Sequence, residues 1–84
     1  MSKKEKLIAR LKGMPKDFTF DELETLLNYF GYELSSKGKT SGSRIMFVSS
    51  AYGNIMLHKP HGRKELLEYQ IKQIIEILVK EELI

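Results

Sequence analysis

Apolar residues recur at helical spacing in three segments of the chain. The three sets are Leu7, Ile8 and Leu11; Leu23, Leu26, Leu27 and Phe30; and Leu67, Ile71, Ile74, Ile75, Leu78 and Leu83. Because residues three and four apart lie on one face of a helix, each set predicts a helix with one apolar face. Ser2 and Thr19 each precede a glutamate by three residues, the spacing of a capping box, so they are predicted to begin the first two helices. Gly13 and Gly31 are predicted to end them, and the third helix is predicted from about Lys64 onward.

Between the second and third of these helices, apolar and polar residues alternate instead. This pattern predicts three short strands at residues 32–36, 43–49 and 54–58. The SSAYG segment before the last strand has the length of a hairpin loop, and Gly53 suits its left-handed position. Pro60 is predicted to end the sheet because it lacks a backbone N–H. The order of elements favours an α+β fold, in which the helices pack on one face of a three-stranded antiparallel sheet and leave the other face open.

The alternation also predicts which side chains lie on the open face. The bulkier, β-preferring set should face the helices, and it comprises Ile45, Phe47, Ile55 and Leu57. Arg44 and His58 are then on the open face. A hairpin loop centred on Ala51 places Arg44 opposite His58, whereas a bulge at Gly53 places His58 opposite Met46. Both registers leave Arg44 and His58 as neighbours on the same face.

Length and composition limit the classes of protein that the chain can belong to. Its 84 residues are enough for a single domain, residues 1–84, with a modest core. The absence of cysteine excludes disulfides, thiol catalysis and cysteine-ligated zinc. The first residues are charged throughout, unlike a signal peptide, and no apolar run approaches the roughly 18 residues that a membrane span needs. We therefore expect a cytoplasmic protein without a membrane segment.

The net charge of +3 is unevenly distributed along the chain. Residues 17–33 contain five acids and no lysine or arginine, whereas residues 34–64 contain no acid. The basic residues of this second stretch are Lys37, Lys39, Arg44, Lys59, Arg63 and Lys64, accompanied by His58 and His61. Such a stretch favours a phosphate partner, although it is equally compatible with an ordinary solvated surface. The six cations, together with Ser43 at the start of a strand, are the candidate RNA contacts.

These residue types match the requirements of RNA cleavage without a metal ion. That reaction needs a base for the 2′-hydroxyl proton, an acid for the leaving oxygen and a cation for the charged phosphorane. Histidine titrates near neutrality, so His58 and His61 are the candidate acid and base. Arg44 stays protonated, so its role is to bind and stabilise phosphate rather than to accept a proton. Two histidines three residues apart without a nearby carboxylate fall short of a metal-ligand set, and no cofactor is expected.

Three short motifs resemble the HicA-type mRNA interferase toxins. They are SGSRIMF, the hairpin sequence YGNI, and LHKPHGRKEL before the last helix. The resemblance covers residues 18–84 and leaves residues 1–13 as an N-terminal helical extension. It implies a fold like that of a double-stranded-RNA-binding domain. The glycine, serine and phenylalanine of the family's pattern match Gly42, Ser43 and Phe47, while its catalytic histidine falls on Arg44. Its later proline, histidine and glycine are similar to Pro60, His61 and Gly62.

The resemblance implies a metal-independent endoribonuclease that cuts mRNA and that is inhibited by an antitoxin of the HicB type. Two interpretations of the Arg44 position remain open. In the first, His58 or His61 supplies the base and Arg44 holds the phosphate; in the second, the chain binds RNA without cutting it. A third interpretation is a protein-interaction domain that uses an exposed apolar patch of Met46, Val48 and Met56.

Overall fold

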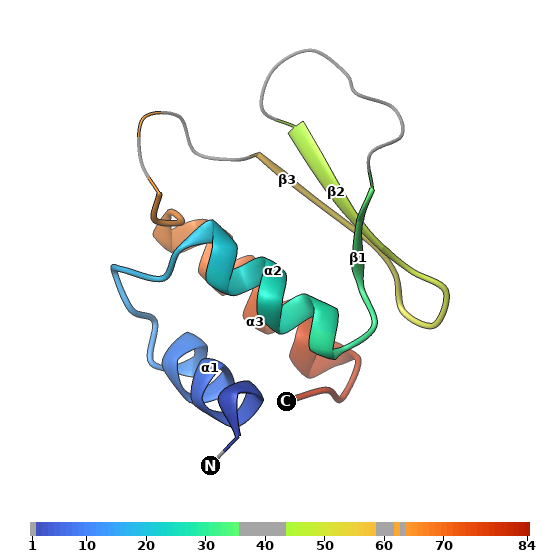
Figure 1. The fold of residues 1–84 in the computed structure, drawn as a ribbon, viewed down its shortest axis with the longest axis horizontal. Helices are drawn as coiled ribbons and strands as arrows, with labels where there is room; N and C mark the ends of the chain where they lie inside the picture. Colours follow the sequence, from blue (N-terminus) through green and yellow to red (C-terminus); the bar gives the residue numbers. More distant parts are fainter. Residues whose placement is uncertain (1, 36–43, 59–61, 63) are drawn as a thin grey trace.

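The described part of the chain forms three helices and a three-stranded antiparallel sheet, in the order predicted from the sequence (Figure 1). The structure is a computed structural model that describes residues 2–35, 44–58, 62 and 64–84. The elements are α1 (Lys3–Lys12), α2 (Phe20–Tyr29), β1 (Glu33–Ser35), β2 (Arg44–Ser49), β3 (Gly53–His58) and α3 (Glu68–Lys80). The expectations for Ser36, Ser43 and Pro60 lie outside the described residues.

The first two helices begin where the capping residues were predicted. The Ser2 side chain accepts a hydrogen bond from the backbone N–H of Glu5 at 3.2 Å. Thr19 and Glu22 form a complete capping box, in which the Thr19 hydroxyl accepts from Glu22 N–H at 3.1 Å and the Glu22 carboxylate accepts from Thr19 N–H at 3.0 Å. Because this arrangement satisfies two N–H groups that the helix leaves free, it fixes the start of α2. At the other end of α2, Gly31 has a φ of 92°, as expected for a glycine that ends a helix.

The third helix begins at Glu68, so the prediction of a start near Lys64 is wrong. The segment before it is extended and pairs with the start of α2. Phe20 N–H donates to the Lys64 carbonyl at 3.0 Å, and Leu66 N–H donates to the Phe18 carbonyl at 2.8 Å. Backbone groups engaged in this antiparallel bridge cannot also form helical hydrogen bonds. The pairing therefore prevents the helix from starting at Lys64 and holds residues 64–66 against the start of α2.

The sheet has the order β1-β2-β3 and the first of the two predicted registers. Arg44 pairs with His58 at one end of the β2–β3 hairpin, and Ser49 pairs with Gly53 at the other. Gly53 has a φ of 85°, so the prediction of a left-handed glycine is confirmed. The Ser49 hydroxyl accepts hydrogen bonds from the N–H groups of Ala51 and Tyr52, both at 3.2 Å, and thereby closes the loop.

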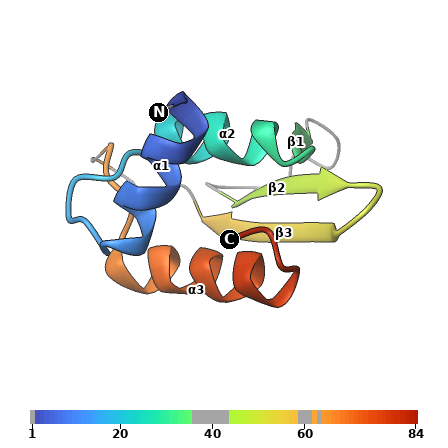
Figure 2. The same cartoon turned by 90° about the horizontal axis from the view of Figure 1, so that it is seen from below.

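The helices and the sheet form two layers with the core between them (Figures 1 and 2). Burial alternates along β3, where Ile55 and Leu57 are buried while Met56 and His58 are exposed. α1 packs against α2 and α3 rather than against the sheet, and it contributes Leu7 and Leu11 to the core. Because one face of the sheet is covered by helices and the other is not, the α+β architecture with helices on one face is confirmed.

Tyr32 places a hydroxyl inside this core. Its side chain is fully buried, its ring centroid lies 5.9 Å from that of Tyr52, and its hydroxyl has no hydrogen-bond partner among the described residues. Burial raises the pKa of Tyr32, and the charges of Glu81 and Tyr52 raise it further. The folded state therefore keeps this proton at a pH where the unfolded chain loses it. Since the unfolded chain then binds fewer protons, the free energy of unfolding falls as the pH rises above about 10.

We expect the substitution Tyr32→Phe to raise the free energy of unfolding by about 1 kcal/mol at neutral pH, because it removes a buried hydroxyl without a partner among the described residues. The advantage of the variant should grow above about pH 10, where only the parent loses stability by ionising Tyr32. Denaturant unfolding at neutral and alkaline pH measures both effects. Tyr69→Phe, at a position that is 61% exposed, is the matched control and should change neither. An advantage that stays constant with pH would contradict the assignment to Tyr32.

Candidate functional site

The uncovered side of the sheet, called here the open face, carries the candidate site. Residues that pair directly across antiparallel strands have side chains on the same face. The register therefore assigns to the open face the described side chains of Glu33, Ser35, Met46, Val48, Asn54, Met56 and His58. Met56 is 46% exposed and His58 is exposed, whereas Met46 and Val48 are partly buried. The open face thus combines a small apolar patch with a histidine at one end of it.

Arg44 and His58 occupy paired positions at the end of the hairpin. Their Cα atoms are partners in the register, as predicted from a loop centred on Ala51. His58 lies on the open face, so the prediction for its side chain is confirmed. The side chain of Arg44 lies outside the described part of the structure. The backbone therefore brings these two site positions together, and the direction of the arginine stays a prediction.

The other predicted site residues are mostly outside the described ranges. Lys64 is described and exposed, and it lies in the extended approach to α3. The remainder, Lys37, Lys39, Ser43, Lys59, His61 and Arg63, are not described. Their roles stay predictions, and the structure fixes only the ends of the segments that carry them.

The end of β3 is attached to the start of α3 by Gln70, a residue that the sequence analysis did not single out. The Gln70 side-chain N–H donates to the carbonyl of His58 at 2.6 Å. Its side-chain oxygen accepts from the backbone N–H of Leu67, the N-cap of α3, at 3.0 Å. Leucine has no side-chain acceptor, so only this half of a capping box exists at α3. A signal was present in the sequence, since Gln70 occupies a position on the apolar side of α3, three residues after Leu67 and four before Ile74.

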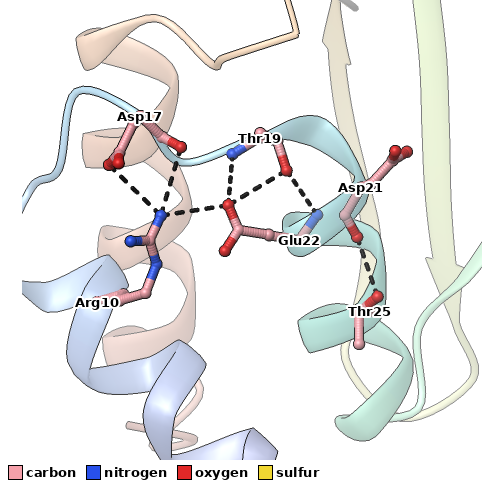
Figure 3. Close-up of polar contacts among 6 residues, drawn as sticks. All are labelled: Arg10, Asp17, Thr19, Asp21, Glu22 and Thr25. Carbon is pink, nitrogen blue, oxygen red and sulfur yellow. Dashed lines mark hydrogen bonds and ion pairs between the residues drawn. The ribbon is translucent and has the colours of Figure 1, made fainter.

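A second polar network joins α1 to the start of α2 (Figure 3). The Arg10 guanidinium in α1 lies 3.4 Å from the Asp17 carboxylate and 3.2 Å from the Glu22 carboxylate, and it also donates to the Asp17 backbone carbonyl at 3.3 Å. Glu22 belongs to the capping box with Thr19, whose neighbours pair with residues 64–66. This network therefore links α1 to the start of α2, and the backbone pairing extends the link to Lys64.

Across residues 2–35, 44–58, 62 and 64–84, no group of three or more histidine, aspartate or glutamate side chains is arranged to hold a metal ion. In that part of the chain, no helix combines the length and the apolar character needed to cross a membrane.

Comparison with known families decides the classification. The family model described as the HicA toxin of bacterial toxin–antitoxin systems matches residues 20–78, which is more than half of the chain. The chain belongs to the HicA toxin family. No curated protein and no solved structure gave a significant match. The family resemblance inferred from the motifs is therefore confirmed, and with it membership in a family of toxins.

The HicA match covers the whole sheet and the candidate site but leaves out the N-terminal helix. It begins at Phe20, the first residue of α2, and ends at Leu78, within the last turn of α3. All the predicted catalytic and RNA-binding residues lie inside it. α1 lies outside the match, although Leu7 and Leu11 are part of the same core as the matched region.

Proposed function

We propose that this chain is the toxin of a type II toxin–antitoxin system and that it cuts mRNA as a metal-independent endoribonuclease. The observation that carries the proposal is the placement of His58 on the open face, opposite Arg44 in the register, in a member of the HicA toxin family. The acid-free stretch of residues 34–64 supports it, because the six cations of this stretch favour a polyanionic partner. The proposed site of action is the cytoplasm, where mRNA is translated.

The proposed reaction is attack of a ribose 2′-hydroxyl on the adjacent phosphorus. His58 or His61 removes the hydroxyl proton, and a protonated histidine supplies a proton to the departing 5′-oxygen. The new P–O bond gives a 2′,3′-cyclic phosphate, and the broken bond releases a 5′-hydroxyl. Arg44 stabilises the negative charge on the phosphorane, since its guanidinium donates to two phosphate oxygens at once. Lys37, Lys39, Ser43, Lys59, Arg63 and Lys64 bind the flanking backbone.

A second candidate function is RNA binding without cleavage. The specific observation in its favour is Arg44, which stands where the motif of the family has its catalytic histidine and which cannot act as a base. Both functions predict salt-dependent RNA affinity, with the logarithm of the affinity falling about linearly in the logarithm of the salt concentration. Only the first predicts cleavage products. In both cases the proposed protein partner is a HicB-like antitoxin that covers the open face, where Met46, Val48 and Met56 offer an apolar contact.

Expression in a bacterial host tests the proposed function. We expect the parent chain to arrest growth, and we expect Arg44→Ala to abolish the arrest because it removes the proposed phosphate ligand. Lys80→Ala, which removes an exposed cation at the far end of α3, is the matched control and should still arrest growth. Co-expression of the product of the neighbouring open reading frame should restore growth. Equal growth arrest by the parent and Arg44→Ala would contradict the assigned role of Arg44.

A further inference from the structure

Apart from the hydroxyl of Tyr32, Gln70 is the one polar side chain that is buried within the described part of the chain. It is 1% exposed, and both its side-chain N–H and its side-chain oxygen form hydrogen bonds. Burial of an amide without hydrogen-bond partners is unfavourable. The two hydrogen bonds of Gln70 are therefore needed for this side chain to be buried. Here they connect the last residue of β3 to the first turn of α3.

The two groups that Gln70 joins are the ends of the segment that contains most of the proposed site. His58 is the last residue of β3, and Leu67 is the N-cap of α3. Between them in the sequence lie the proposed site residues Lys59, His61, Arg63 and Lys64. One side chain therefore holds both ends of this segment at a fixed separation, and it does so through the backbone carbonyl of a proposed catalytic histidine.

We propose that Gln70 is a positioning residue for the open-face site, which sets the backbone of His58 relative to α3 through its side-chain N–H. The contact with Leu67 alone is a helix cap, and it accounts only for the orientation of the side-chain oxygen. The contact with His58 spans twelve residues and adds nothing to the helix. It orders the site instead, because catalytic groups must be held within a fraction of an ångström of their productive geometry. The catalytic consequence rests on the proposed function, whereas the contact itself does not.

The substitution Gln70→Glu removes one of the two hydrogen bonds and keeps the other. A glutamate keeps an oxygen that accepts from Leu67 N–H, but in its ionised form it has no hydrogen to donate to the His58 carbonyl. A carboxylate oxygen and the His58 carbonyl oxygen, which are both hydrogen-bond acceptors, then face each other and repel. When the carboxyl group is protonated, its O–H can donate to His58 and the original pattern returns. Gln73→Glu makes the same chemical change at an exposed position of the same helix and is the matched control.

The proposal is tested in two independent ways on the full chain. In the parent protein, NMR should detect a coupling through the hydrogen bond between the Gln70 side-chain nitrogen and the His58 carbonyl carbon, and absence of this coupling would overturn the proposal. In Gln70→Glu, the His58 carbonyl shift should differ from that of the parent at pH 8 and approach it as the pH is lowered toward 5. In Gln73→Glu it should follow the parent at every pH. A shift in Gln70→Glu that equals the parent's at pH 8 would also overturn it.

RNA cleavage gives the functional arm of the test. At pH 8 we expect Gln70→Glu to lower kcat by at least about 10-fold with KM within about threefold, the pattern of a misplaced catalytic group rather than of lost binding. The ratio of the variant's kcat to the parent's should recover toward pH 5, while Gln73→Glu stays at the parent level. An unchanged kcat in the folded variant would reject the positioning role. If the parent itself does not cleave RNA, the proposed function fails, and the NMR arm still decides whether Gln70 holds His58.

Discussion

Replacing both candidate bases, in the variant His58→Ala/His61→Ala, is expected to lower the rate of RNA cleavage by at least about 100-fold. The physical reason is that no other residue of the acid-free stretch from 34 to 64 titrates near neutral pH, and Arg44 cannot accept a proton. The measurement is the single-turnover cleavage rate of a labelled mRNA fragment. The two single variants then identify the base, because substitution of the residue that accepts the 2′-hydroxyl proton should cause the larger fall in the cleavage rate.

The effect on catalysis must be separated from an effect on binding or folding. Asn54→Ala is the matched control, since it removes another exposed polar side chain from the open face but no acid or base, and it should leave the rate near that of the parent. The RNA affinity of the double variant should also stay close to that of the parent, because the six cations of residues 34–64 are unchanged. Strong growth arrest and rapid cleavage by the double variant would exclude both histidines as the base.

The second large expected effect concerns the N-terminal helix. Leu11 lies in α1, outside the matched HicA region, yet it is fully buried in the shared core. Leu11→Ala is therefore expected to lower the free energy of unfolding by about 2–5 kcal/mol, the usual result of emptying a buried leucine site. A small domain has a total stability of about 5–15 kcal/mol, so this loss is a large part of it. Denaturant unfolding followed by circular dichroism measures it.

The same experiment tests whether residues 1–84 are one cooperative domain. Lys12→Ala, at an exposed position of the same helix, is the matched control and should change stability by less than about 0.5 kcal/mol. If α1 is integral, Leu11→Ala shifts a single transition to lower denaturant concentration. If the substitution instead affects a separate early transition and leaves the main one in place, α1 is an independent extension, and the single-domain proposal is wrong.

Features of the fold that depend on neighbouring residues were predictable from the sequence. The capping box of Thr19 and Glu22 needs only residues three apart, and it forms as expected. The length of the hairpin loop limited the pairing to two registers, and the structure has the one centred on Ala51, in which Arg44 pairs with His58. In each case the information is local, because the partners are joined by a short stretch of chain.

The features that were missed depend on partners that are distant in the sequence. The start of α3 was placed too early because residues 64–66 pair with residues 18–20. The spacing of apolar residues within the helix does not predict this pairing, since its partners are more than 40 residues away in the sequence. Gln70 was missed because its partner is the His58 carbonyl, a backbone group that every residue has. The 40% exposure of Leu34 was not predicted either, although its register partner Phe47 is fully buried on the same face of the sheet. β1 is an edge strand, so one of its flanks has no neighbouring strand to cover such a side chain.

We propose that this HicA family member cuts RNA by acid–base chemistry of its own side chains. The most direct measurement is incubation of the purified chain with mRNA in excess EDTA, followed by analysis of the RNA ends. We predict discrete fragments that carry 2′,3′-cyclic phosphate and 5′-hydroxyl ends, because the 2′-hydroxyl is the attacking group and no metal takes part. Intact RNA after incubation with the folded protein, at a salt concentration where the two are bound, would contradict the claim and leave RNA binding without cleavage as the function.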